Sequence, residues 1–427
     1  QGEGHTQEPM QTADGRTLGV LRGEVLQHSD GAVFLLWAVP LSHPQILFDE
    51  YVYTRASYHT PGEIGTGSYL YTYLLNALSF LPQYDFYYVA KLLNITFVVV
   101  LGVGIYLIAR SFVSMNQALF IALLVPLFPV SIWVNVLMPD IMHISMMILT
   151  LGLVHWGLSR EKNWLYPTAV VSGVIFGLAN LVKIHSMFLI PGFLVLIAYL
   201  AWKKFGLRNA VYSTVIWLFS GLTVKTLLGY ILGGPDGARL LGGYQEALFA
   251  RLFGGGASRS LGENLNFLGF SGTITDETVS PGSIPLLVID RLSTHLPIFL
   301  LMFGWVLMLM LVLSTNSRVE VGRTELTAYH ALLASSPLTI NALLLTIAFN
   351  VYVTLIGDDH TNRVLFRYLE FVLVYSSVLA IAAVMTVQAR KHLSPTLRAV
   401  TILLPVIIFA LTLFGPQGRI SISYADS

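Results

Sequence analysis

Long apolar stretches set the fold class of this chain. A helix needs about 20 mostly apolar residues to cross a bilayer, and the chain offers about eleven stretches of this kind. They cover roughly residues 31–47, 86–109, 115–137, 141–158, 165–182, 187–202, 211–232, 295–314, 331–356, 367–388 and 398–415. The sequence therefore predicts an all-α polytopic integral membrane protein with about eleven transmembrane helices.

The composition supports this class and excludes others. Hydrophobic residues make up 55% of the 427 residues and charged residues only 11%, against about 25% charged in soluble domains. A net charge of +1 argues against a nucleic-acid surface. The chain has no cysteine, which excludes disulfides, thiolate nucleophiles and metal sites built on cysteine.

The distribution of basic residues orients the predicted helices. When the loops are assigned alternately to the two sides, one side receives nearly all the Lys and Arg and few acids, and the positive-inside rule makes it the cytoplasm. Residues 1–30 are then a cytoplasmic tail. The basic residues on this side are Arg110, Arg160, Lys162, Lys203, Lys204, Arg208, Arg318, Arg323, Arg390, Lys391 and Arg398, against Glu161, Glu320 and Glu325.

The rest of the chain, residues 31–427, is predicted to form one membrane domain. Core helices occupy 31–232, and their first exterior loop, 48–85, is rich in tyrosine, as expected of helices that lie in the headgroup layer. Residues 233–294 form a second exterior loop whose glycines favour mobility. Residues 295–427 supply the C-terminal helices.

Two acids directly follow the first apolar stretch. Asp49 and Glu50 stand at the predicted exterior membrane edge, where each carboxylate would cost roughly 2.5 to 3.5 kcal/mol if it entered hydrocarbon. Their position indicates chemistry at that surface. The alternative is structural, with Asp49 capping the next helix or pairing with Arg55.

The order of the motifs resembles the C-type (GT-C) membrane glycosyltransferases. The resemblance implies an inverting hexosyl- or pentosyltransferase of a bacterial inner membrane, with its active site on the exterior face. Its donor would be a polyprenyl-phosphate sugar, and its acceptor a hydroxyl of a glycan, a lipid or an exported protein; nucleic acid has no part. The segments that carry the resemblance are Phe48-Asp49-Glu50-Tyr51, Met138-Pro139-Asp140, Leu181-Val182-Lys183, Asn362-Arg363 and Arg367-Tyr368-Leu369.

The resemblance also suggests catalytic roles for the two acids. A carboxylate that takes the proton of an acceptor hydroxyl contributes typically about 10² to 10⁴ in rate. Asp49 is the candidate base. Glu50 is either part of the site or a support for it.

The leaving lipid phosphate needs positive charge near its oxygens. Arg363 and Arg367 are four residues apart, so on a helix they share a face, and the guanidinium fork suits phosphate. Lys183 and His185 could add a second contact. The alternatives are that these cations snorkel to the interface, or that Arg367 pairs with Glu370.

Asp140 and His143 stand three residues apart and can face the same way. They are either polar support or, together with Asp49, ligands of a divalent cation. A third interpretation is that Asp140 caps its helix and His143 is a hydrogen-bonded interior residue. We expect no metal or other cofactor, because no cluster offers three or more convergent carboxylates.

Two other functions fit parts of the pattern. An O-antigen polymerase or ligase also has many spans and a large exterior loop, but takes pyrophosphate-linked oligosaccharides. A transporter or flippase for lipid-linked sugars would carry charges near the midplane of the bilayer, where Lys91 and Lys225 are the few candidates.

Overall fold

The computed structural model describes residues 53–54, 56–59, 68–124, 137–241, 327–355 and 361–386, together with a few single positions between 286 and 403. For residues 83–84, 329, 349–355 and 361–368 it describes the backbone alone. Every regular element in these parts is helical, and 6 helices among them are long and apolar enough to cross a membrane. The prediction of an all-helical, multi-span membrane protein is confirmed at this level.

The described helices follow the predicted apolar stretches closely. The stretch predicted at 331–356 is divided in two at Ser335. The stretches at 31–47, 295–314 and 398–415, and most of 115–137, lie outside the described residues. The elements are α5 (Tyr69–Asn76), α6 (Gln83–Arg110), α7 (Met115–Leu123), α8 (Asp140–Ser159), η3 (Lys162–Trp164), α9 (Leu165–Val182), η4 (Ile184–Leu189), α10 (Ile190–Phe205), α11 (Leu207–Ala238), α15 (Ala328–Ala334), α16 (Ser336–Leu355) and α17 (Thr361–Met385).

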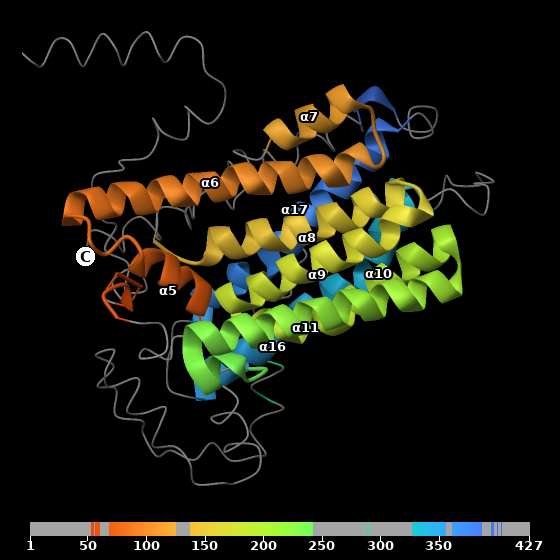
Figure 1. Ribbon diagram of the computed structural model, residues 1–427. Coiled ribbons are helices and arrows are strands. Elements are labelled where there is room, and N and C mark those ends of the chain that lie inside the picture. Colours follow the sequence, from red (N-terminus) through yellow and green to blue (C-terminus); the bar gives the residue numbers. More distant parts are fainter. Residues whose placement is uncertain are drawn as a thin grey trace, which may run out of the picture.

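The helices form a bundle with two distinct ends (Figure 1). Helices α6, α8, α9 and α11 lie side by side, and α17 packs behind α8. We call the end where α8 begins and α9 ends the Asp140 end; it lies on the left in Figure 1. The opposite end, where α10 ends and α11 begins, is the Lys203 end.

Small residues allow α9 and α11 to pack backbone against backbone. Gly173 and Gly177 stand one turn apart on α9 and face the main chain of α11. A Cβ atom at Gly173 would collide with the carbonyl oxygen of Trp217, and one at Gly177 with that of Gly221. Close approach of this kind is a common source of helix association in lipid, where apolar burial gives little driving force.

Helix α5 comes from the first predicted exterior loop and packs against α9 and α11. Its Tyr69 is buried, and the Tyr69 ring fills the space where Gly233 of α11 lacks a side chain. Tyr71, also buried, meets the ring of Tyr53 edge-on at 5.7 Å. The contact of Tyr69 with Gly233 attaches this part of the loop to the Asp140 end of the bundle, whereas the contact of Tyr53 with Tyr71 lies within the loop.

The chain reverses direction near the end of α11. Gly234 has φ +60°, a conformation that side chains other than glycine rarely adopt, and Pro235 follows it. Beyond this point the backbone folds back, so that Gly237 touches Gly229. The sequence predicts a loop at this Gly-Pro segment, but the structure shows helix on both sides of a sharp turn.

Candidate functional site

Asp140 and Lys183 are brought together by the ends of two adjacent helices. Asp140 is the first residue of α8, after Pro139, and Lys183 directly follows the last residue of α9. An acid at a helix N-terminus and a cation at a helix C-terminus both suit the helix dipole. The Lys183 ammonium lies 2.5 Å from the Asp140 carboxylate, and both side chains are buried.

A second polar contact lies one turn further along α8. The Nε2 atom of His143 and the Oγ atom of Ser186, in η4, are 2.5 Å apart. The Ser186 hydroxyl donates its proton to the carbonyl oxygen of Lys183 at 2.8 Å. With the Ser186 proton assigned to that carbonyl oxygen, the neutral imidazole donates from Nε2, and its Nδ1 is the unprotonated nitrogen.

In this tautomer the Nδ1 atom of His143 is a hydrogen-bond acceptor. It is buried and has no hydrogen-bond partner among the residues that the structure describes. A buried acceptor left in this state costs free energy unless something donates to it. The imidazole thus offers one lone pair at the Asp140 end of the bundle.

Helix α17 also reaches this cluster. The Phe371 ring meets the His143 ring edge-on, with 6.4 Å between centroids. Positions 363 and 367 precede Phe371 by two turns and one turn of the same helix, so they share its face. The backbone of α17 therefore carries both arginine positions along the helix face that meets His143.

The remaining predicted site residues are placed unevenly. Asp49 and Glu50 lie outside the described residues, and for Arg363 and Arg367 only the backbone is described. His185 is half-buried in η4, two residues beyond Lys183. Within its described part, the structure brings Asp140, His143 and Lys183 to one place.

The interpretation of Asp140 as a helix cap is wrong in detail. The cap position is occupied by Pro139, and the Asp140 side chain is engaged by the ammonium of Lys183. Ser186 was not predicted at all. Neither its spacing from His143, 43 residues along the chain, nor its residue type marks it in the sequence.

The cluster has few features of a metal site. Among the described residues, no group of three His, Cys, Asp or Glu side chains could hold a metal ion. A divalent cation bound to Asp140 would also lie beside the Lys183 ammonium and be repelled by it. Asp49 and Glu50 are outside the described part, so a reaction without metal stays a prediction.

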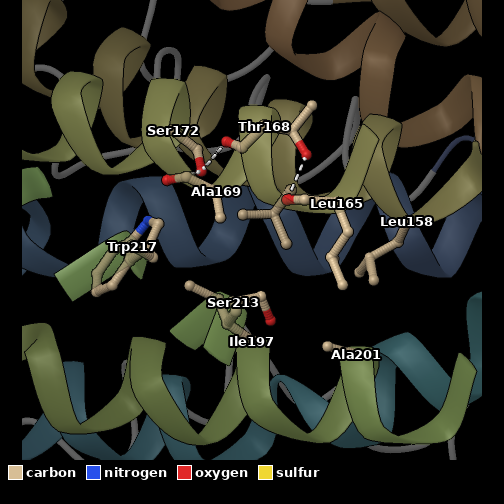
Figure 2. Close-up of a pocket in the computed structure, with 10 residues that line it drawn as sticks. Leu158, Leu165, Thr168, Ala169, Ser172, Ile197, Ala201, Ser213 and Trp217 are labelled. Carbon is tan, nitrogen blue, oxygen red and sulfur yellow. Dashed lines mark hydrogen bonds between the residues drawn. The ribbon is translucent and has the colours of Figure 1, made fainter. Parts of the chain in front are cut away.

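A small pocket lies in the opposite half of the bundle (Figure 2). It is lined mainly by apolar side chains of α8 to α11, among them Leu158, Leu165 and Trp217. In its wall, the Thr168 hydroxyl donates to the carbonyl oxygen of Trp164, just before α9, and the Ser172 hydroxyl to that of Thr168. With no charged group in its lining, this pocket is a poor candidate for the chemistry.

Comparisons with solved structures find archaeal oligosaccharyltransferases of Archaeoglobus fulgidus. One, in complex with Zn and sulfate, is 16% identical with a TM-score of 0.49, over 89% of this chain and 52% of that chain. Another, AglB in complex with an inhibitory peptide and a dolichol-phosphate, is 16% identical with a TM-score of 0.45, over 92% of this chain and 56% of that chain. This chain thus spans little more than half the length of these proteins.

A comparison with curated proteins finds no match. Residues 70–228 match the model of a protein family, dolichyl-phosphate-mannose-protein mannosyltransferase. The matched part runs from α5 into α11 and contains Asp140, His143, Lys183 and Ser186. This match confirms the resemblance to the C-type membrane glycosyltransferases, which use polyprenyl-phosphate sugars.

Proposed function

We propose that this protein is an inverting glycosyltransferase that moves a sugar from a polyprenyl-phosphate carrier to an acceptor hydroxyl. The observation that carries the proposal is the family match over residues 70–228, because it covers the helices that assemble the Asp140–Lys183 cluster at one membrane end. We place that end on the exterior side, since the basic loops occupy the other. The acceptor is a glycan, a lipid or an exported protein.

The architecture that we propose extends beyond the described helices. About eleven spans, interfacial helices in the loop 48–85 and a second exterior loop that begins after α11 and ends at residue 294 complete a single membrane domain. The C-terminal helices, residues 295–427, bring Arg363 and Arg367 to the site through α17. Residues 1–30 form the cytoplasmic tail.

The reaction requires a base and a stabilised leaving group. The acceptor oxygen attacks the anomeric carbon from the face opposite the phosphate and loses its proton to Asp49, with Glu50 beside it. The bond between the anomeric carbon and the phosphate oxygen breaks, and its electron pair leaves with the polyprenyl phosphate. Inversion at the anomeric carbon follows from this single displacement.

Lys183 is the candidate phosphate contact whose position is described. Its ammonium carries three N–H donors, and Asp140 fixes the location of that ammonium at the end of α9. Asp140 therefore acts as polar support and not as a metal ligand. Arg363 and Arg367, which share the face of α17 next to His143, add the bidentate donors that phosphate favours.

His143 suits the recognition of a sugar or acceptor hydroxyl. With Nε2–H donated to Ser186, its Nδ1 can accept a hydrogen bond from a substrate O–H. His185, two residues after Lys183, stands at the same edge as a further polar contact.

The direct test is transfer by purified protein supplied with radiolabelled polyprenyl-phosphate sugars and candidate acceptors. Asp49→Asn should lower turnover by at least about 10², because the amide cannot take the proton. The paired substitution Asp140→Asn with Lys183→Gln removes both charges together and should lower kcat/KM by about 10- to 100-fold. Lys162→Gln, an exposed cation at the Lys203 end, is the matched control and should match wild type.

Four results would each overturn a part of the proposal. Turnover like wild type in Asp49→Asn would show that Asp49 is not the base. Undiminished kcat/KM in the paired variant would show that Lys183 does not bind the donor. Loss of activity in EDTA with recovery in manganese or magnesium would show that the reaction requires a metal ion. Sugar transfer from pyrophosphate-linked oligosaccharides alone would point to a polymerase or ligase instead.

A further inference from the structure

The turn between α10 and α11 concentrates positive charge at the Lys203 end. Lys203 and Lys204 lie in the last turn of α10, and Arg208 in the first turn of α11. Gly206, with φ +84°, allows the sharp change of direction between the two helices. The turn therefore gathers three cations within six residues.

These cations are held by aromatic rings rather than by acids. In the described part of the chain the ion pairs are Asp140–Lys183 and Asp236–Arg239, neither of which involves this turn. Instead the Lys203 ammonium lies 5.9 Å from the centre of the Tyr199 ring, and the Arg208 guanidinium 5.6 Å from that of Tyr212. Lys204 lies 5.5 Å from the ring of Phe205.

The turn between α8 and α9 adds to the same surface. The Tyr166 hydroxyl donates to the Asn209 side chain at 2.9 Å, which ties the start of α9 to the start of α11. Arg160 and Lys162 are exposed beside it, and Arg160 lies 5.2 Å from the ring of Trp156. Glu161 is the one acid that the structure describes in these two turns.

Large apolar side chains project between the cations. Leu207 is 67% exposed, Trp202 53% and Trp164 50%. All three adjoin helices that cross the membrane, so they mark the depth at which acyl chains meet headgroups. A free phosphate in water would gain nothing from this apolar surround, whereas a phospholipid would match both parts.

We propose that these two turns form a binding surface for the phosphate headgroups of anionic phospholipids. Lys203, Lys204 and Arg208 supply the charge, and Trp202 and Leu207 contact the acyl chains. The rings behind the cations leave their charge unneutralised while restricting their motion. The proposal does not depend on glycosyl transfer.

Native mass spectrometry of the full chain in detergent tests this surface. Phosphatidylglycerol should bind about tenfold more tightly than phosphatidylcholine with the same acyl chains, because salt weakens the attraction to exposed cations but does not abolish it. The triple variant Lys203→Gln, Lys204→Gln, Arg208→Gln should lose that preference and keep its phosphatidylcholine binding. Equal affinities for the two lipids in wild type, or an undiminished preference in the triple variant, would overturn the proposal.

Controls separate this surface from general charge and from free phosphate. Arg110→Gln removes one cation at the end of α6, which α8 and α9 separate from the start of α11 in Figure 1, and should leave the preference intact. Soluble glycerophosphate should not displace phosphatidylglycerol; displacement would mean a phosphate site and not a lipid surface. If the triple variant does not fold, the wild-type protein still tests the proposal, because its preference for phosphatidylglycerol must decrease as the salt concentration rises.

Discussion

Lysine side chains are buried at one end of the bundle and exposed at the other. At the Asp140 end, Lys183 and Lys225 are 8% and 1% exposed, and each ammonium donates hydrogen bonds to protein oxygens. At the Lys203 end, Lys203 is exposed, and its ammonium rests over an aromatic ring. A buried cation is positioned by its protein partners, whereas the position of an exposed one depends on whatever lies outside the bundle.

The difference has an energetic origin. Removal of a charge from water costs several kcal/mol unless other groups replace the lost hydration. Asp140 does this for Lys183, and the carbonyl oxygens of Gly237, Ala238 and Arg239 do it for Lys225. An exposed lysine keeps its water and needs no such partner. Substitutions should therefore have large effects at one end and small effects at the other.

The largest effect is expected from separating the Asp140–Lys183 pair. Lys183→Met leaves a buried carboxylate without its ammonium and should lower the free energy of unfolding by roughly 3 to 5 kcal/mol. Unfolding in mixed micelles with increasing dodecyl sulfate measures this. Adding Asp140→Leu should restore most of the loss, and a double variant as unstable as the single one would show that the pair is not the cause.

A smaller effect is expected where Lys225 holds the reversed end of α11. Lys225→Met removes the donor to three carbonyl oxygens and should cost about 1 to 3 kcal/mol. Hydrogen exchange of the amides at residues 236–240 should rise more than that of α8. Lys225→Arg, which can still donate, is the control; equal exchange in the Met and Arg variants would contradict the assignment.

An intermediate effect is expected at His155 and Tyr375, which separate the influence of burial on stability from that of position in the bundle. His155 lies near the Lys203 end but is buried, and its Nε2 atom is 2.7 Å from the Tyr375 hydroxyl. Tyr375→Phe should cost about 1 kcal/mol, the usual size of a hydrogen bond between membrane helices. Tyr212→Phe, at a half-exposed tyrosine of the Lys203 end, should change stability far less. Similar losses of stability in the two variants would show that burial does not decide the size of the effect.

The smallest effect is expected at the exposed turn. Lys203→Gln should change the free energy of unfolding by no more than about 0.5 kcal/mol in uncharged detergent, since the charge is solvated in both states. The same micelle titration applies. A loss as large as that for Lys183→Met would mean that exposure does not separate the two ends.

The helices were largely predictable because hydropathy is a local property. The stretches predicted at 141–158 and 165–182 agree with α8 and α9 to within a residue at each end. The end of α11 was not predicted, because Gly-Gly-Pro usually marks a loop and only the contact of Gly229 with Gly237 shows that the chain folds back.

The contacts within the site were less predictable than its location. Topology alone put Asp140, His143 and Lys183 on one side of the membrane. Their partners depend on how helices pack, and no spacing rule connects His143 to Ser186 or His155 to Tyr375, which is 220 residues away. Lys225 has the appearance of a midplane charge in the sequence, but the structure shows it bound to carbonyl oxygens of the returning chain.

The reversal at Gly234 also sets where the chain departs from the bundle. Residues 225 to 233 rise about 12 Å along α11, at 1.5 Å per residue, and the returning segment descends beside them until Arg239 meets Lys225. The connection to the next part of the chain thus starts well below the tip of the helix.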